Sequence, residues 1–301
     1  MDKQSVKGIL LVAIGASSYG VVASFIKKGV AAGYTTAELT FAQALMGTLA
    51  IVLINLILKK ASPAQKAIHP QKKDIIKLLL GGIPLGLTST FYYLSLQYIP
   101  VSVCIVMLMQ SVWVGTVIDL VINKVKPSST KLVSIAIVLI GTVLATNVLN
   151  ADITLDWRGI FWGFLAALSY SFTFLATNNI ATGYRPIVRS MYLLLGALTI
   201  VSLIWGYSLF QKFDPNVLWT WGIIIAFFGT ILPPLLFTKG MPMVGVGLGA
   251  IIASIELPVS VSMAYFFINE SVNVYQWIGI VLILFAIILM NISFIKRSKP
   301  N

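Results

Sequence analysis

Residues 8–26 read GILLVAIGASSYGVVASFI and contain no charged side chain. A helix spans a bilayer core with about 20 predominantly apolar residues, so this stretch predicts a membrane-spanning helix. A secretory signal peptide would have a shorter apolar core followed by a small-residue cleavage site. We therefore interpret 8–26 as the first helix of the mature protein.

The same pattern recurs along the whole chain. Of its 301 residues, 58% are hydrophobic and 10% are charged, whereas a soluble domain carries roughly 25% charged residues. The mean hydropathy is +0.95. The predicted fold class is therefore an all-α integral membrane protein with ten transmembrane helices. The nine further spans are 36–58, 75–97, 101–122, 131–149, 158–180, 187–209, 217–238, 243–268 and 273–295.

The basic residues indicate the orientation in the membrane. With the N-terminus in the cytoplasm, 17 of the 21 Lys and Arg residues fall on the cytoplasmic side, as the positive-inside rule requires. The net charge of +12 is spread over short clusters between apolar stretches. This pattern suits a bilayer with an anionic inner surface and argues against nucleic-acid binding. We expect a multi-pass protein of the cell membrane with both termini in the cytoplasm.

An internal repeat divides the chain. Lys7-Gly8-Ile9 and Ser18-Tyr19 recur 151 residues later as Arg158-Gly159-Ile160 and Ser169-Tyr170. We therefore expect two related halves of five helices each, residues 1–150 and 151–301. Further matches at offsets of 142 and 146 residues are Ile99-Pro100 with Met241-Pro242, Gln110 with Glu256, and Asn123-Lys124 with Asn269-Glu270.

The odd number of helices per repeat has a consequence for topology. The second half must cross the membrane in the opposite sense to the first, which makes the repeat inverted. Inverted repeats allow alternating access around one central site. The alternative is that duplication only produced a stable bundle. The longest connection, about 59–74, is too short to hold a domain, so the helices must carry the function, and we favour transport.

Three short motifs resemble those of a known family. They are YYLSLQYIPVS at 92–102, Glu256-Leu257-Pro258-Val259, and Asn269-Glu270 followed by Gln276-Trp277-Ile278-Gly279. Together with the paired halves, they make nearly the whole chain similar to the EamA-type, ten-helix branch of the drug/metabolite transporter (DMT) superfamily. The resemblance implies two EamA-like repeats and a carrier, commonly an exporter of amino acids or other metabolites.

The first half departs from that family pattern at three positions. Gln43 stands where the branch often has an arginine, Val112 where it often has a proline, and Lys124 where it often has an acidic residue. The first half is thus the more diverged, and the resemblance does not identify the cargo.

Two carboxylates lie well inside predicted spans, Asp119 and Glu256. An acidic residue at a helix centre costs about 2.5–3.5 kcal/mol on insertion scales, so each needs a reason. Pro258 removes a backbone donor and frees a carbonyl one turn earlier, which places Glu256 beside loosened backbone. We hypothesise that Glu256 faces a central cavity and takes up a proton or binds a cationic or hydroxyl group of the substrate. The alternative is a neutral interhelical hydrogen bond.

Asp119 lies about one turn from the cytoplasmic end of its predicted span, where Lys124 could reach back to it. A structural ion pair or a gate is the first interpretation, and substrate contact is the second.

Small polar and aromatic residues are candidates for the rest of the substrate-binding wall, although each could instead make ordinary hydrogen bonds between helices. Tyr19 and Tyr170 are the strongest, because the repeat places them at symmetric depths. Prolines inside predicted spans are candidate kinks or hinges. The remaining wall candidates are Tyr92, Gln110, Trp113 and Ser169, and the candidate hinge or gate prolines are Pro84, Pro233 and Pro258.

The rare residues exclude several kinds of chemistry. Cys104 is the single cysteine and His69 the single histidine, so we expect no disulfide within the chain, no metal site, no cofactor, and no Ser-His or Cys-His catalysis. A lipid-modifying enzyme would need clustered acidic, basic or histidine groups near one face. A receptor or scaffold would normally show a sizeable water-exposed region, which the sequence does not predict.

The remaining expectations concern the transport cycle. We expect a small-molecule substrate and a surrounding bilayer, with export favoured and uptake as the alternative. Facilitated export and proton-coupled antiport both remain open. Faces of small residues, such as Gly82 to Gly86, permit a homodimer but do not require one.

Overall fold

The computed structural model describes residues 3–61, 70–99, 101–148, 156–269 and 271–297. His69, Pro100 and Glu270, which enter the sequence predictions, lie outside these ranges. The described residues form helices and contain no strand. The helices of the first half are α1 (Lys3–Ala31), α2 (Thr36–Ala61), α3 (Lys72–Leu96), α4 (Val101–Leu108), α5 (Ser111–Val121) and α6 (Ser129–Ala145).

The second half has more breaks. Its elements are α7 (Trp157–Asn179), α8 (Pro186–Gln211), the π-helical turn η2 (Leu218–Gly222), α9 (Ile223–Ala226), the π-helical turn η3 (Phe227–Ile231), α10 (Leu232–Val244), α11 (Val246–Ala253), α12 (Glu256–Ile268) and α13 (Val274–Arg297).

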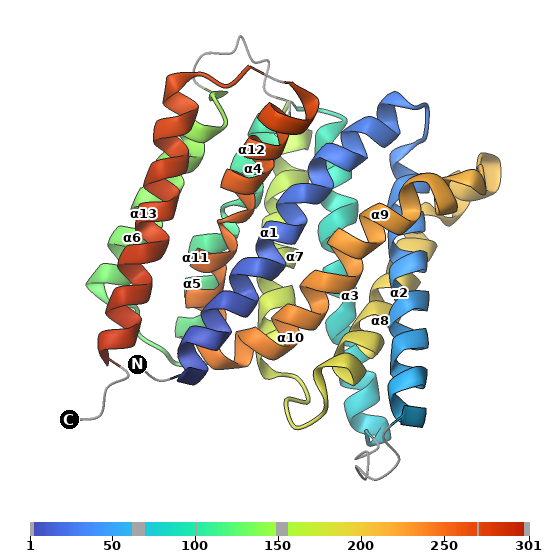
Figure 1. Ribbon diagram of the computed structural model, residues 1–301, viewed down its shortest axis with the longest axis horizontal. Coiled ribbons are helices and arrows are strands. Elements are labelled where there is room, and N and C mark those ends of the chain that lie inside the picture. The colour runs from blue at the N-terminus through green and yellow to red at the C-terminus, as the bar shows by residue number, and fades with distance from the viewer. Residues whose placement is uncertain (1–2, 62–69, 100, 149–155, 270, 298–301) are drawn as a thin grey trace.

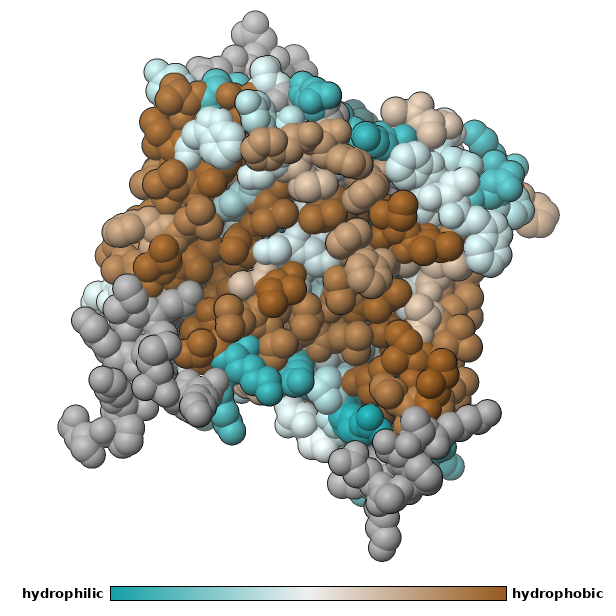
Figure 2. Space-filling model, viewed as in Figure 1, coloured by the Kyte–Doolittle hydropathy of each residue, from teal (hydrophilic) through white to brown (hydrophobic). Residues whose placement is uncertain are grey.

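The helices have the length and composition of membrane spans. Within the described ranges, eight segments are long and apolar enough to cross a bilayer, and two shorter apolar helices lie at Ser129–Ala145 and Val274–Met290. These ten segments correspond in order to the ten predicted spans, and the count of ten crossings stays a prediction. In Figure 2, hydrophobic residues form a band across the visible face, with hydrophilic residues towards both ends. Such a band suits a multi-pass membrane protein.

The two halves are interleaved. α3 packs along α7 and α8, α1 packs along α10 and α12, and α6 pairs with α13 (Figure 1). Glycines allow the closest of these contacts: a Cβ at Gly82 would collide with the Leu193 carbonyl, and one at Gly196 with the Leu79 carbonyl. The close helix packing expected at Gly82 is therefore present. Most long helices find their main partner in the other half.

The fourth and ninth predicted spans are each broken near the middle. α4 ends at Leu108 before α5, and α11 ends at Ala253 before α12. At the second break, Pro258 has no NH to offer the Ser254 carbonyl, and the Leu257 NH donates to that carbonyl instead, at 3.1 Å. At the first break the Val112 NH donates to the Met109 carbonyl, also at 3.1 Å. The first half thus forms the same tight turn without a proline.

The broken helices repeat at an offset of 145 residues. α4 and α11 begin at Val101 and Val246, and α5 and α12 begin at Ser111 and Glu256. Lys124 and Asn269, which follow α5 and α12, both have positive φ. The structure therefore pairs Glu256 with Ser111, and the predicted match of Gln110 with Glu256 is shifted by one residue.

In the eighth predicted span, the π-helical turn η3 precedes Pro233 and Pro234. Across the π-helical turn η3, the Leu232 NH donates to the Phe227 carbonyl, five residues back. The same spacing would pair the Phe228 carbonyl with Pro233, which has no NH. The Ser18 hydroxyl donates to the Phe228 carbonyl at 2.6 Å. In α3, by contrast, the helix continues through Pro84.

Ser18→Ala is expected to destabilise the protein by about 1 kcal/mol, because the Phe228 carbonyl loses its donor. The measurement is the thermal unfolding midpoint in detergent, with Ser17→Ala as the neighbouring control. An unchanged midpoint for Ser18→Ala would contradict this role.

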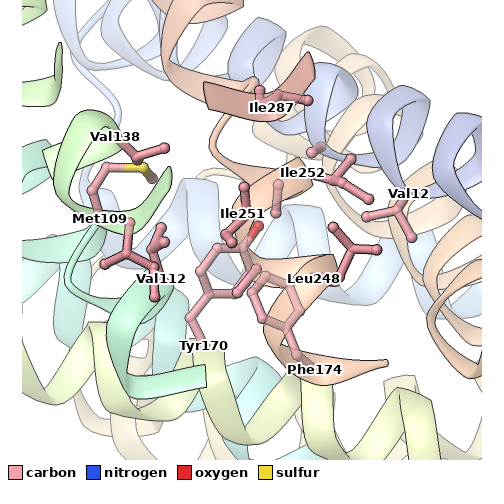
Figure 3. Close-up of a cluster of buried hydrophobic side chains, with 14 of the residues drawn as sticks. Val12, Met109, Val112, Val138, Tyr170, Phe174, Leu248, Ile251, Ile252 and Ile287 are labelled. Atoms are coloured by element: carbon pink, nitrogen blue, oxygen red, sulfur yellow. The ribbon is translucent and has the colours of Figure 1, made fainter. Parts of the chain in front are cut away.

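The largest apolar core joins residues of α1, α5, α6, α7, α11 and α13. It extends from the two breaks towards the end where the chain begins and α13 finishes, which we call the terminal end (Figure 1). Figure 3 shows Val112 of α5 together with Leu248 and Ile251 of α11, with further side chains from α1, α6, α7 and α13. This packing closes the terminal end.

Candidate functional site

A cavity is lined by helices of both halves of the chain. Its volume is about 470 Å³, within the usual range for small-molecule sites. Exposed residues at its rim, including Lys27 and Gln97, show that it opens at the end opposite the terminal end. Deeper wall residues are Tyr92 on α3, Ile105 on α4 and Ser260 on α12.

Glu256 lies one helical turn deeper than Ser260, at the first residue of α12. The Tyr170 hydroxyl donates to Glu256 Oε2 at 3.0 Å. The Tyr170 ring in turn contacts Tyr19 on α1. A pair of tyrosines from α1 and α7 thus borders one acidic group below the cavity.

Tyr19 and Tyr170 meet each other edge to face, with ring centroids 6.1 Å apart. The repeat relates these two residues by an offset of 151. The contact therefore joins equivalent positions of the two repeats, and the Tyr170 hydroxyl links it to Glu256.

α1 packs closely against the backbone at Glu256. A Cβ at Gly20 would collide with the Glu256 carbonyl. At the related place in the first half, the Ser171 hydroxyl contacts the Ser111 carbonyl at 3.3 Å. α1 and α7 therefore cross the two broken helices in the same way, and only the second crossing carries a carboxylate.

Some of the other predicted wall residues lie near the cavity or near Glu256, and others do not. Tyr92 lines the cavity, and Ser169 is buried on α7 next to Tyr170. Gln110 does not reach Glu256: its amide donates to the Val106 carbonyl at 2.9 Å and accepts from Trp113 Nε1 at 2.9 Å. The Trp113 ring is 36% exposed. The Gln110–Trp113 pair therefore lies apart from the tyrosine–glutamate cluster.

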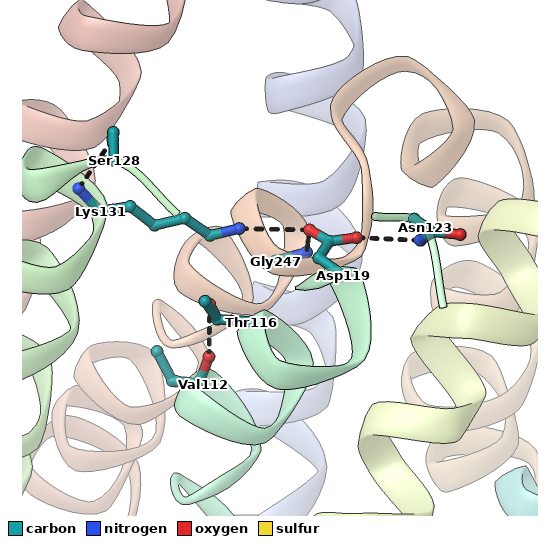
Figure 4. A network of polar contacts seen from close by, with 7 residues as sticks. All are labelled: Val112, Thr116, Asp119, Asn123, Ser128, Lys131 and Gly247. Carbon is teal, nitrogen blue, oxygen red and sulfur yellow. Dashed lines mark hydrogen bonds and ion pairs between the residues drawn. The ribbon is translucent and has the colours of Figure 1, made fainter. Parts of the chain in front are cut away.

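Asp119 is the centre of a buried network at the terminal end (Figure 4). Its Oδ2 accepts from Lys131 Nζ at 3.2 Å and from the Gly247 NH at 2.5 Å, while Oδ1 accepts from Asn123 at 3.0 Å. Asp119 and Lys131 are 4% and 6% exposed. The predicted partner Lys124 is wrong, because Lys124 is exposed and the ion pair forms with Lys131 on α6.

Arg189 on α8 is a buried cation, one of the 17 basic residues that the sequence analysis placed on the cytoplasmic side. It is 1% exposed and donates to three backbone carbonyls: Ile180 at 2.9 Å, Thr177 at 2.6 Å, and Thr238. The first two carbonyls lie at the end of α7, where they lack helical partners. Thr238 lacks one because Pro242 has no NH. Arg189 thus joins three helices structurally.

Among the described residues, no group of three or more His, Cys, Asp or Glu side chains could hold a metal ion. The groups that the structure brings together here are the Glu256 carboxylate and the Tyr19 and Tyr170 phenols, below a cavity wall with few charges. Such a site can bind a small molecule or a proton.

Comparisons with known proteins agree with this architecture. The model of the EamA-like transporter family matches the chain twice, over residues 6–147 and 157–292. A search of curated proteins found no match. A solved structure titled "Crystal structure of protein" superposes with a TM-score of 0.76 at 12% identity, covering 97% of this chain and 99% of the other. At this identity the likeness shows a shared fold only.

Proposed function

The chain belongs to the EamA-like transporter family of the DMT superfamily, and from this premise we propose that it exports small metabolites, such as amino acids or related amphipathic compounds, by alternating access. In the proposed orientation the terminal end faces the cytoplasm and the 470 Å³ cavity opens to the outside of the cell membrane. The conformation described above is then the outward-open one. Uptake through the same site is the alternative, since the direction follows the gradients.

The observation that carries this proposal is the position of Glu256. The carboxylate lies below the cavity, beside the Tyr19–Tyr170 contact, where a substrate could be reached from either side as the halves rearrange. A buried ionisable group inside a span is a functional candidate by default. Tyrosine rings attract cations through their π faces, so the cluster suits a proton or the ammonium group of a substrate.

An export profile tests the proposal. The wild type and Glu256→Ala would be overexpressed in a bacterial host, and amino acids and related metabolites in the medium would be quantified by mass spectrometry. We expect one compound class to accumulate outside with the wild type only. If both strains match the empty vector while both proteins are folded in the membrane, export of common host metabolites is contradicted.

Tyr170→Phe tests how the hydroxyl contributes. The substitution keeps the ring and removes the hydrogen bond to Glu256. A hydrogen bond to a charged group contributes about 1.5–3 kcal/mol, so we expect counterflow at low substrate concentration to slow by about tenfold or more. Tyr207→Phe is the matched control, because it removes a hydroxyl from an exposed ring on α8. Equal counterflow rates in the two variants would contradict the role of Tyr170.

A further inference from the structure

The 145-residue offset of the broken helices relates the two ends of the protein. α4, α5 and α6 correspond to α11, α12 and α13. In an inverted repeat, a position near one membrane face corresponds to a position near the other. Each cavity wall residue on these helices therefore has a counterpart towards the terminal end.

The counterparts of the cavity wall are buried. On α12, Ser260, Val261 and Ala264 line the cavity and are partly exposed. Their counterparts on α5 are Gly115, Thr116 and Asp119, all of which are buried. The same relation holds between Gln276 and Lys131, and between Ile105 and Ala250.

The buried set contains an ion pair and a hydrogen bond to the backbone. Asp119 on α5 joins Lys131 on α6 and the Gly247 NH on α11. At the open end, the positions of Asp119 and Lys131 are occupied by Ala264 and Gln276, which cannot form an ion pair. Gln276 instead donates to the Ala145 carbonyl at 3.2 Å. Corresponding positions at the two ends thus differ in their polar chemistry.

We propose that Asp119, Lys131 and the Gly247 NH form a latch that holds the cytoplasmic side shut, and that opening it exposes a second vestibule lined by Gly115, Thr116, Asp119, Lys131 and Ala250. The inference rests on the proposed alternating access. Breaking the latch separates α5, α6 and α11 and brings water to both charges. Opening this end therefore breaks one ion pair and one hydrogen bond to the backbone, in addition to the apolar contacts between α5 and α11.

The latch is tested by the access of thiol reagents. Cys104 is buried, and Cys104→Ser gives a background without cysteine. In that background Thr116→Cys reports on the cytoplasmic side, and its counterpart Val261→Cys reports on the outer side. Each reporter is labelled with a membrane-impermeant maleimide, in inside-out and right-side-out vesicles respectively. With the latch intact, we expect Val261→Cys to react readily and Thr116→Cys to react slowly.

Two substitutions break the latch by different means. Lys131→Met removes the cation. Gly247→Ala keeps both charges, but its Cβ would collide with Lys131 Nζ and Asp119 Oδ2. With either variant we expect Thr116→Cys labelling to rise about tenfold and Val261→Cys labelling to fall, because the population shifts towards the inward-open state. Arg158→Met is the control, since it breaks the exposed ion pair with Asp156 at the outer end.

Opposite changes at the two reporters support the latch. Unchanged labelling in both latch variants would overturn it, as would labelling that rises at both reporters together, because a general loosening has that effect. The readout needs no substrate. If labelling changes in opposite directions at the two reporters but no metabolite is transported, the latch is supported and the proposed export is contradicted. If metabolites are transported but labelling does not change, the export is supported and the latch is contradicted.

Discussion

Glu256→Gln is expected to reduce transport by about a hundredfold when the substrate carries an ammonium group, because removing one partner of a buried charge pair costs about 2–5 kcal/mol. The amide keeps the size of the side chain and can still accept the hydrogen bond from Tyr170. The measurement is counterflow of the identified substrate in proteoliposomes at several pH values.

The pH series separates the two proposed roles of the carboxylate. If Glu256 binds the substrate, transport falls at every pH. If it carries a coupled proton, counterflow persists but loses its dependence on pH. Glu38→Gln is the control, because Glu38 is also a buried acidic residue but accepts hydrogen bonds from Thr35 and from the Asp214 NH at the start of α2. A Glu256→Gln protein with the wild-type rate and pH dependence would contradict both roles.

Arg189→Met is expected to be the most destabilising single substitution among those considered. It leaves the carbonyls of Thr177, Ile180 and Thr238 without their donors, and an unsatisfied buried polar group costs about 1–3 kcal/mol. We expect a loss of about 3–5 kcal/mol, read as a lower yield of monodisperse protein and a lower unfolding midpoint in detergent.

Arg185→Met is the matched control for that substitution, since Arg185 is exposed and lies four residues earlier in the chain. Arg189→Lys should recover part of the stability, because an ammonium group provides donors without the planar fork of arginine. A protein with Arg189→Met that is as stable as the control would show that water or other donors satisfy the three carbonyls.

The sequence predicted the architecture well because the bilayer imposes simple rules. Uncharged stretches of about 20 residues identify spans, and the match of Ser18-Tyr19 with Ser169-Tyr170 identified the repeat. The break before Glu256 could be anticipated from Pro258. The equivalent break at Met109 and Gln110 could not, because no proline or glycine marks it. There the tertiary packing, rather than local propensity, shapes the backbone.

The site was harder to predict because partners come from distant helices. Asp119 was recognised as an acid inside a span, but Lys124 was predicted as its partner because it could reach back from the span end, and Lys131 was only counted on the cytoplasmic side. Arg189 was assigned in the same way. Long basic side chains near a span end can reach water or turn inward, and sequence spacing does not distinguish the two. A proline four residues after a carbonyl, as Pro242 is after Thr238, is the one signal that could have indicated a buried donor.

The interleaving of the two halves also matters while the protein is being made. α3 packs along α7 and α8, and α1 packs along α10, so the first half enters the membrane before its partners exist. At about 5–20 residues per second, the ribosome needs roughly 10–30 s to add the 150 residues that follow. During that interval the glycine-lined face of α3 is covered only by lipid or by the insertion machinery. The chain is therefore most exposed to wrong helix pairing and to quality-control proteolysis while only its first half is in the membrane.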